Sequence, residues 1–171
     1  MITPGYWAIL QPHKDLELMI AVVQGQVIRI CYIRNKAQQV EQLETESPTI
    51  QWKESPKEKT IRLASFQIIE FFKKKRKTFD LSLELNGTDF QKLVWKGLMK
   101  VPFGDLLSYG DLAIFVDKPR AARAVGTAMS LCEHLIVVPC HRVISGDGSI
   151  GGFGDALHVK RILLQIEGHK F

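Results

Sequence analysis

The chain has 171 residues, of which 46% are hydrophobic, a composition that suits one domain or two small domains. Its three cysteines, Cys31, Cys132 and Cys140, form no CxxC pair, and its five histidines have no ligand spacing. These counts argue against a disulfide framework and a four-sulfur zinc site, and we expect no metal. The net charge of +5 is compatible with a nucleic-acid partner but does not require one.

The hydropathy of the chain predicts a protein of a reducing compartment. No apolar run is long enough to span a bilayer, and the first apolar residues follow no basic cluster of the kind that begins a secretory signal. We therefore expect no membrane partner and a location in the cytoplasm, associated with the nucleoid if the organism is prokaryotic.

The first half of the chain predicts a mixed α/β fold. Apolar runs predict three strands, which cover residues 6–10, 16–23 and 27–33. A tight turn at residues 24–26 joins the last two. The polar stretch 34–60 predicts an irregular connection or one with a short helix. One-faced apolar spacing predicts a helix over 61–77, whose basic end is interpreted first as a solvated helix terminus and second as a phosphate patch. Period-two alternation predicts a strand over 79–85.

A domain boundary is expected at Asn86-Gly87, where the pattern changes from mixed to helical. Residues 1–86 then form an N-terminal α/β scaffold domain, which has no residue types suited to chemistry. Residues 87–171 form a second domain, which carries all the candidate functional residues.

Four helices are predicted in this second domain from local signals. Thr88 with Gln91 forms a capping box, and Ser108 with Asp111 marks a second capped start. Gly168 is the stop of the last helix. The predicted helices cover residues 90–101, 109–116, 120–131 and 156–168.

The second and third of these helices, with the short turn between them, have the outline of a helix-turn-helix. Pro119 is expected in the first turn of the third helix. That helix has alanine or glycine at positions 121, 122, 124, 126 and 128, so Arg120 and Arg123 stand out from it. Small residues indicate either close packing between helices or insertion into a narrow minor groove with an arginine as probe.

Cys140 is the candidate nucleophile, in the segment "IVVPCHRVISGDG". A cysteine after an apolar run is either an inert core residue or a thiolate held ionised by neighbouring positive charge or histidine. Pro139 stiffens the backbone in front of it. If the segment is extended, the side chains of Cys140 and His141 point to opposite sides. His141 then activates the thiol only across a sharp turn or through a water molecule.

An acid is needed to orient the imidazole of His141. Glu167, at the end of the last helix, is one candidate, and Glu133 and Asp147 are nearer in sequence. The residues themselves leave this choice open.

The motifs "SYGDLA", "KPRAARAVGTAM", "VVPCHRV", "GGF" and "LLQIEG" follow one another in this order. Their order and spacing resemble the O6-alkylguanine-DNA alkyltransferases over about half of the chain, from Thr88 to Gly168. The resemblance implies a ribonuclease-H-like α/β N-terminal domain and a mostly α, winged helix-turn-helix-like C-terminal domain. It also implies irreversible, single-turnover transfer of a methyl or alkyl group from O6-alkylguanine in double-stranded DNA to the protein. No cofactor and no obligate protein partner are implied, and we expect a monomer.

The same resemblance implies the catalytic roles. Cys140 is the acceptor, and His141 is its base, acting through a bridging water. Glu167 orients His141. Tyr109 donates a hydrogen bond to guanine N3 and helps to offset charge on the departing base.

The resemblance also implies how DNA and the flipped guanine are held. Arg123 fills the base stack where the nucleotide has swung out toward the minor groove. The main-chain carbonyls of Cys140 and Val143 accept from the guanine amino group, and the N–H of Gly154 donates toward O6. The further residues expected in these roles are Arg120, Ala122 and Gly126 at the DNA and Gly152, Phe153 and Met129 in the pocket.

The sequence departs from the family pattern at a few positions. Cys132-Glu133 stands where the family usually has Asn-Pro, and Phe153 stands where many members have tyrosine. The four-cysteine zinc module of some relatives is missing, so a sensor role is not expected. Two other classes stay open: a protein that binds alkylguanine without repairing it, and a thiol hydrolase. The presence of Cys140 argues against the first, and the second leaves "RAARAVG" unexplained.

Overall fold

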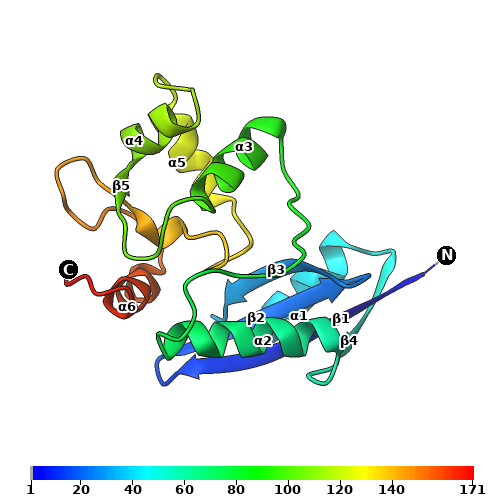
Figure 1. Ribbon diagram of the computed structural model, residues 1–171. Helices are drawn as coiled ribbons and strands as arrows, with labels where there is room; N and C mark the ends of the chain where they lie inside the picture. Colours follow the sequence, from blue (N-terminus) through cyan, green and yellow to red (C-terminus); the bar gives the residue numbers. More distant parts are fainter. Residues whose placement is uncertain (1) are drawn as a thin grey trace. The chain divides into compact units, whose positions relative to one another are not determined.

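The computed structural model describes residues 2–171 and divides the chain into two compact units, which meet in sequence between Glu84 and Leu85 (Figure 1). We call residues up to Glu84 unit 1 and residues from Leu85 unit 2. Each unit has its own buried apolar core. The expected α/β first half and mostly helical second half are confirmed.

Unit 1 is built on a four-stranded mixed sheet with the order β3-β2-β1-β4. Strands β1 (Thr3–His13), β2 (Leu16–Val23) and β3 (Gln26–Tyr32) form an antiparallel meander, as predicted from their apolar runs. The turn between β2 and β3 has φ angles of 49° at Gln24 and 78° at Gly25. Two left-handed residues in succession match the right-handed twist of the strands that they join.

Two helices cover this sheet, α1 (Lys36–Glu46) and α2 (Lys59–Phe72). Leu43 of α1 packs with Met19 and Ala21 on one face of β2. Every residue of β2 except Glu17 is buried, because α2 covers the other face, in front of the sheet in Figure 1. The predicted helix at residues 61–77 is therefore confirmed, although it ends before the basic run.

Two expectations for unit 1 need correction. The stretch 34–60 is not an irregular connection, since it contains α1 and also β4 (Ile50–Glu54), which pairs parallel to β1. Alternation did not reveal β4, because this edge strand is mostly polar and exposed. The strand expected at 79–85 is wrong, and only a single bridge joins Leu83 to Val27.

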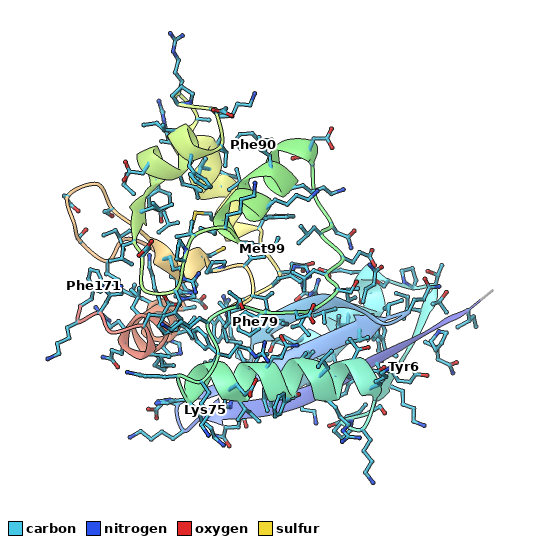
Figure 2. The ribbon with its side chains drawn as sticks, viewed as in Figure 1. Tyr6, Lys75, Phe79, Phe90, Met99 and Phe171 are labelled. Atoms are coloured by element: carbon cyan, nitrogen blue, oxygen red, sulfur yellow. The ribbon has the colours of Figure 1, made fainter. Side chains whose placement is uncertain are left out.

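The side chain of Gln67 explains why residues 79–85 form no ladder. Its Oε1 accepts from the Asp80 N–H at 2.8 Å and its Nε2 donates to the Asp80 carbonyl at 2.9 Å. Phe79, labelled in Figure 2, packs its ring 5.8 Å from that of Phe71. The segment 79–85 is thus held by a helix side chain at Asp80 and by β3 only around Leu83.

Unit 2 contains four helices and a two-stranded parallel sheet. Its elements are α3 (Asp89–Leu98), β5 (Leu107–Ser108), α4 (Tyr109–Phe115), α5 (Ala122–Ser130), β6 (Val143–Ile144) and α6 (Leu157–Ile166). Both predicted capping boxes are present, at Thr88 with Gln91 and at Ser108 with Asp111. Over residues 2–171, no helix has the length and apolar character that crossing a membrane requires.

The helix-turn-helix formed by α4 and α5 starts its second helix later than predicted. Pro119 lies in a turn closed by the Ala121 N–H and the Lys118 carbonyl at 2.8 Å, and α5 begins only at Ala122. Proline suits the second position of such a turn, because its φ is already fixed near the required value. The indole N–H of Trp95 then joins α3 to α5 through the Ala128 carbonyl, at 2.8 Å.

Candidate active site

The three residues Cys140, His141 and Arg142 form a single turn of 3₁₀ helix, and all three are buried. The apolar run before them is not extended. It turns back at Ile136, whose φ is 75°, and the Val138 N–H donates to the His134 carbonyl at 2.9 Å. From the sequence, His141 could activate the thiol in two ways, across a sharp turn of the chain or through a bridging water. The chain does turn sharply at Cys140.

Glu167 is the centre of the polar network in unit 2. Its Oε1 lies 2.7 Å from Nε2 of His141, and Nε and Nη2 of Arg142 donate to the carboxylate at 3.0 and 2.9 Å. The Gly104 N–H donates to Oε2 at 2.8 Å. Among the three acids considered from the sequence, Glu167 orients the imidazole, whereas Asp147 accepts from Ser149 in an exposed turn.

The environment of this network sets its protonation. Burial by itself raises the pKa of Glu167, but hydrogen bonds from His141 and Arg142 outweigh burial and hold the pKa at about 2. Burial also lowers the pKa of His141, and the Glu167 carboxylate only partly opposes this. The pair is therefore an ionised carboxylate and a neutral imidazole that donates through Nε2. Proton exchange with a thiol falls to Nδ1.

Cys140 rests as a thiol, which corrects the expectation of a thiolate held ionised. Its pKa is raised well above the ordinary value, first because the thiol is hydrogen-bonded to Cys132 and then because of burial and the charge on Cys132. Lys160 opposes this shift. The Sγ of Cys140 lies 4.0 Å from the Met129 carbonyl at the end of α5. Attack by Cys140 must therefore be coupled to loss of its proton.

Lys160 is a functional candidate that the sequence reasoning missed. Its Nζ is buried and donates to the carbonyls of Val143 at 2.6 Å and Gly152 at 3.2 Å, and it lies 5.7 Å from the Phe153 ring. Burial lowers the pKa of Lys160 to about 8, although Cys140 acts against this. The sequence contained a signal for a buried lysine, because Lys160 falls on the same apolar face of α6 as Leu163 and Leu164.

The residues expected in the pocket differ in their contacts. Val143, Gly152 and Phe153 all lie next to the Lys160 ammonium group. Gly154 is exposed, and its φ is 57°. The carbonyl of Cys140 accepts from the Val143 N–H, and the carbonyl of Val143 accepts from Lys160. A carbonyl oxygen has two lone pairs and can accept from more than one donor.

Tyr109 is the first residue of α4, and its ring faces α5. A Cβ built on Gly126 would lie 3.7 Å from the ring, which is an ordinary van der Waals contact, so the ring packs directly against the backbone of α5 at this position. The pKa of Tyr109 is raised by burial and, to a lesser degree, by the negative charge that Cys140 carries when it is ionised. The phenol therefore remains a hydrogen-bond donor near neutral pH, in electrostatic reach of the thiol.

The small residues of α5 fall into a buried group and an exposed group. Ala128 is buried and Ala122 and Gly126 are half-buried, in agreement with close packing of helices. Arg120 and Arg123 are exposed, as are Ala124, Thr127 and Ser130. One face of α5 is thus short and polar, with arginines at its N-terminal end, which is the shape that a narrow groove accepts.

Comparisons with known proteins agree with this geometry. The family described as "6-O-methylguanine DNA methyltransferase, DNA binding domain" matches residues 89–169. A methylated-DNA–protein-cysteine methyltransferase of Methanosarcina barkeri is 44% identical over 109 residues, which span 64% of this chain and 69% of the relative. The crystal structure of the Mycobacterium tuberculosis O6-methylguanine methyltransferase is 30% identical, with a TM-score of 0.80, over 95% of this chain and 92% of that one. A structure of the same organism's OGT in complex with DNA is 31% identical, with a TM-score of 0.79 and the same coverage.

Proposed function

Because the chain belongs to the methylated-DNA–protein-cysteine methyltransferase family, we propose that it repairs DNA by moving the alkyl group of O6-alkylguanine to Cys140. The observation that carries this choice of acceptor is the contact between His141 and Glu167 at 2.7 Å, next to the buried Cys140 thiol. Cys31 lies on β3 of unit 1, where the side-chain amide of Gln39 donates to its sulfur at 3.4 Å. Cys140 therefore has the chemical surroundings that a nucleophile needs.

The reaction is a displacement at the alkyl carbon. The sulfur of Cys140 forms a bond to this carbon while the bond from carbon to O6 breaks, and guanine leaves with the electron pair. The thiol proton passes through a bridging water to Nδ1 of His141, and the departing guanine regains a proton. Glu167 stabilises the imidazolium that forms, since its carboxylate already accepts from Nε2.

The pocket residues support the departing base. Tyr109 donates to guanine N3 and offsets the charge that develops on the base. The carbonyls of Cys140 and Val143 accept from the amino group with their remaining lone pairs, and the Gly154 N–H points to O6. Lys160 fixes Val143 and the loop at Gly152 in place, so these groups are positioned before the base enters.

The product is a thioether on Cys140, which no cellular reductant cleaves. Each molecule therefore acts once, and the amount of DNA repaired equals the amount of protein consumed. The reaction draws its alkyl group from the DNA itself.

The protein binds DNA, and we infer that it does so through α5 in the minor groove of a duplex. Phosphate contacts supply most of the affinity, because a lesion has no fixed sequence context to read. Arg123, exposed on α5, takes the place of the flipped nucleotide in the stack. Flipping requires only a few kcal/mol at a damaged pair, which favours lesions over intact guanine.

The decisive experiment is intact-mass measurement after incubation with an oligonucleotide duplex that contains O6-methylguanine. We expect one added methyl group per molecule, mapped to Cys140, and none in Cys140→Ser. Cys31→Ser is the matched control and should be methylated as the wild type is. DNA binding without any gain of mass would contradict the proposal and favour a lesion-binding protein, and multiple turnovers on an ester would favour a hydrolase.

A second experiment tests the role of Arg123. Arg123→Ala should slow methyl transfer from duplex DNA by about tenfold or more, while its reaction with free O6-benzylguanine stays unchanged. Arg62→Ala, at an exposed position of unit 1, is the control and should affect neither reaction. If the variant is slowed equally on both substrates, Arg123 has no role in base flipping.

A further inference from the structure

The structure places a second thiol against the acceptor. Cys132 follows α5 directly, and its N–H donates to the Met129 carbonyl at 3.2 Å, the same carbonyl that lies 4.0 Å from Sγ of Cys140. The side chains of Cys132 and Cys140 are also hydrogen-bonded to each other. The Met129 carbonyl is therefore a neighbour of both cysteines, which stand at the two ends of the loop 132–140.

The segment between the two cysteines folds back on itself. The His134 carbonyl accepts from the Val138 N–H at 2.9 Å, and the Val138 carbonyl accepts from the Cys140 N–H at 2.8 Å. Leu135 and Val138 form a bridge across the turn. The eight-residue separation of Cys132 and Cys140 is therefore spanned by a compact loop and not by an extended chain.

The two cysteines differ in charge and in access. The hydrogen bond from Cys140 lowers the pKa of Cys132, burial opposes this, and contacts with His134 lower the pKa further, to about 6. Cys132 is half-buried, whereas Cys140 is only 6% exposed. A small oxidant therefore meets a thiolate at Cys132 first, and the thiolate is the form that oxidants attack.

We propose that Cys132 and Cys140 form a reversible dithiol–disulfide pair that takes the acceptor thiol out of use under peroxide and returns it on reduction. This inference deepens the proposed function and rests on Cys140 being the acceptor. The family usually has asparagine at position 132, a side chain that forms no such bond.

The chemistry balances with a peroxide as the oxidant. The Cys132 thiolate attacks one oxygen of hydrogen peroxide, the O–O bond breaks, and sulfenic acid and hydroxide form. The Cys140 thiol then attacks the Cys132 sulfur, and water leaves as the disulfide forms. A dithiol reductant supplies the two electrons that restore both thiols.

A disulfide between Cys132 and Cys140 would protect Cys140 from irreversible oxidation. A solitary acceptor cysteine that is oxidised beyond the sulfenic stage is lost, because sulfinic and sulfonic acids are not reduced by thiols. The disulfide stops oxidation at the reversible stage. It also removes the nucleophile, so the oxidised protein binds DNA without transferring the alkyl group.

The test exposes the purified full chain to a slight molar excess of hydrogen peroxide. We expect the intact mass to fall by two hydrogen atoms, with recovery on addition of dithiothreitol. Cleavage after Glu133 separates the two cysteines, so that a linked pair of peptides identifies the bond. Cys31→Ser should behave as the wild type, and Cys132→Ser should lose no hydrogen atoms and should instead gain one oxygen, as sulfenic acid at Cys140.

Three outcomes would overturn the pair: no loss of mass in the wild type, a disulfide that involves Cys31, or sulfinic acid at Cys140 while Cys132 stays reduced. Methyl transfer measured on the same samples separates this inference from the proposed function. If the internal disulfide forms and transfer continues unchanged, the redox pair stands and Cys140 is not the acceptor. If the disulfide forms and transfer stops until reduction, both stand.

Discussion

The two units bury polar groups very differently. Among residues 2–171, unit 1 buries one polar side chain, Gln67, which carries no charge. Unit 2, of similar length, buries five that can carry charge: His134, His141, Arg142, Lys160 and Glu167. Taking an ion out of water is expensive unless partners replace the water, so such groups are retained where chemistry requires them.

The buried polar groups have different uses in the two units. Unit 1 uses its buried amide only to hold the backbone at Asp80. Unit 2 places the Glu167 carboxylate between a guanidinium and an imidazole and so prepares a base beside a thiol.

Removal of the Glu167 carboxylate should have the largest effect on stability. Glu167→Ala leaves the buried Arg142 without its partner and should lower the free energy of unfolding of unit 2 by about 3–5 kcal/mol. Hydrogen exchange measured by mass spectrometry resolves the two units, and amides of unit 1 should keep their protection. Glu54→Ala, which breaks an exposed pair with Lys36 at 3.4 Å, is the control and should change stability by less than about 1 kcal/mol. Equal losses of stability in Glu167→Ala and Glu54→Ala would contradict the difference that we infer between the two units.

Acid should destabilise unit 2 more than unit 1. The pKa of Glu167 is about 2 in the folded chain against an ordinary value of 4.5, so its stabilisation is complete above pH 4.5 and is lost as the pH falls toward 2. The shift corresponds to about 3 kcal/mol. Unfolding free energies measured across this range should show a slope that Glu167→Gln flattens. A wild-type slope that persists in the variant would assign the effect to other carboxyls.

The buried amide of unit 1 should matter less. Gln67→Met keeps the volume but leaves the Asp80 N–H and carbonyl without partners, and we expect a loss of about 1–3 kcal/mol. Faster hydrogen exchange at residues 79–85 would locate the effect. Gln42→Met, at an exposed position on α1, should stay within about 0.5 kcal/mol of wild type. A larger loss than in Glu167→Ala would reverse the ranking of the two units.

Helix caps should show no difference between the units. Asn35 caps α1 in unit 1 and Thr88 caps α3 in unit 2, each through a side-chain oxygen that accepts a backbone N–H. Asn35→Ala and Thr88→Ala should each lower stability by about 1 kcal/mol, because caps act locally and near the surface. Chemical denaturation of each variant, followed by hydrogen exchange, measures both. A markedly greater loss for Thr88→Ala would mean that unit 2 amplifies every perturbation and not only changes of buried charge.

Features that depend on neighbours within a few residues could be predicted from the sequence. The capping boxes at Thr88 and Ser108 depend on side chains three positions apart, and the strands of the meander depend on apolar runs. The glycine stop at Gly168, with a φ of 99°, is equally local. The order of short motifs around Cys140 was also sufficient to indicate the family.

Tertiary structure alone decided the features that join distant residues. It selected Glu167 as the partner of His141, buried Lys160 against Val143, and held Asp80 by hydrogen bonds from Gln67. It also brought Cys132 against Cys140, so that Cys140 rests as a thiol. The physical reason is that desolvation and pairing of a polar group depend on what the fold packs around it. Those neighbours come from other elements, and local sequence carries no record of them.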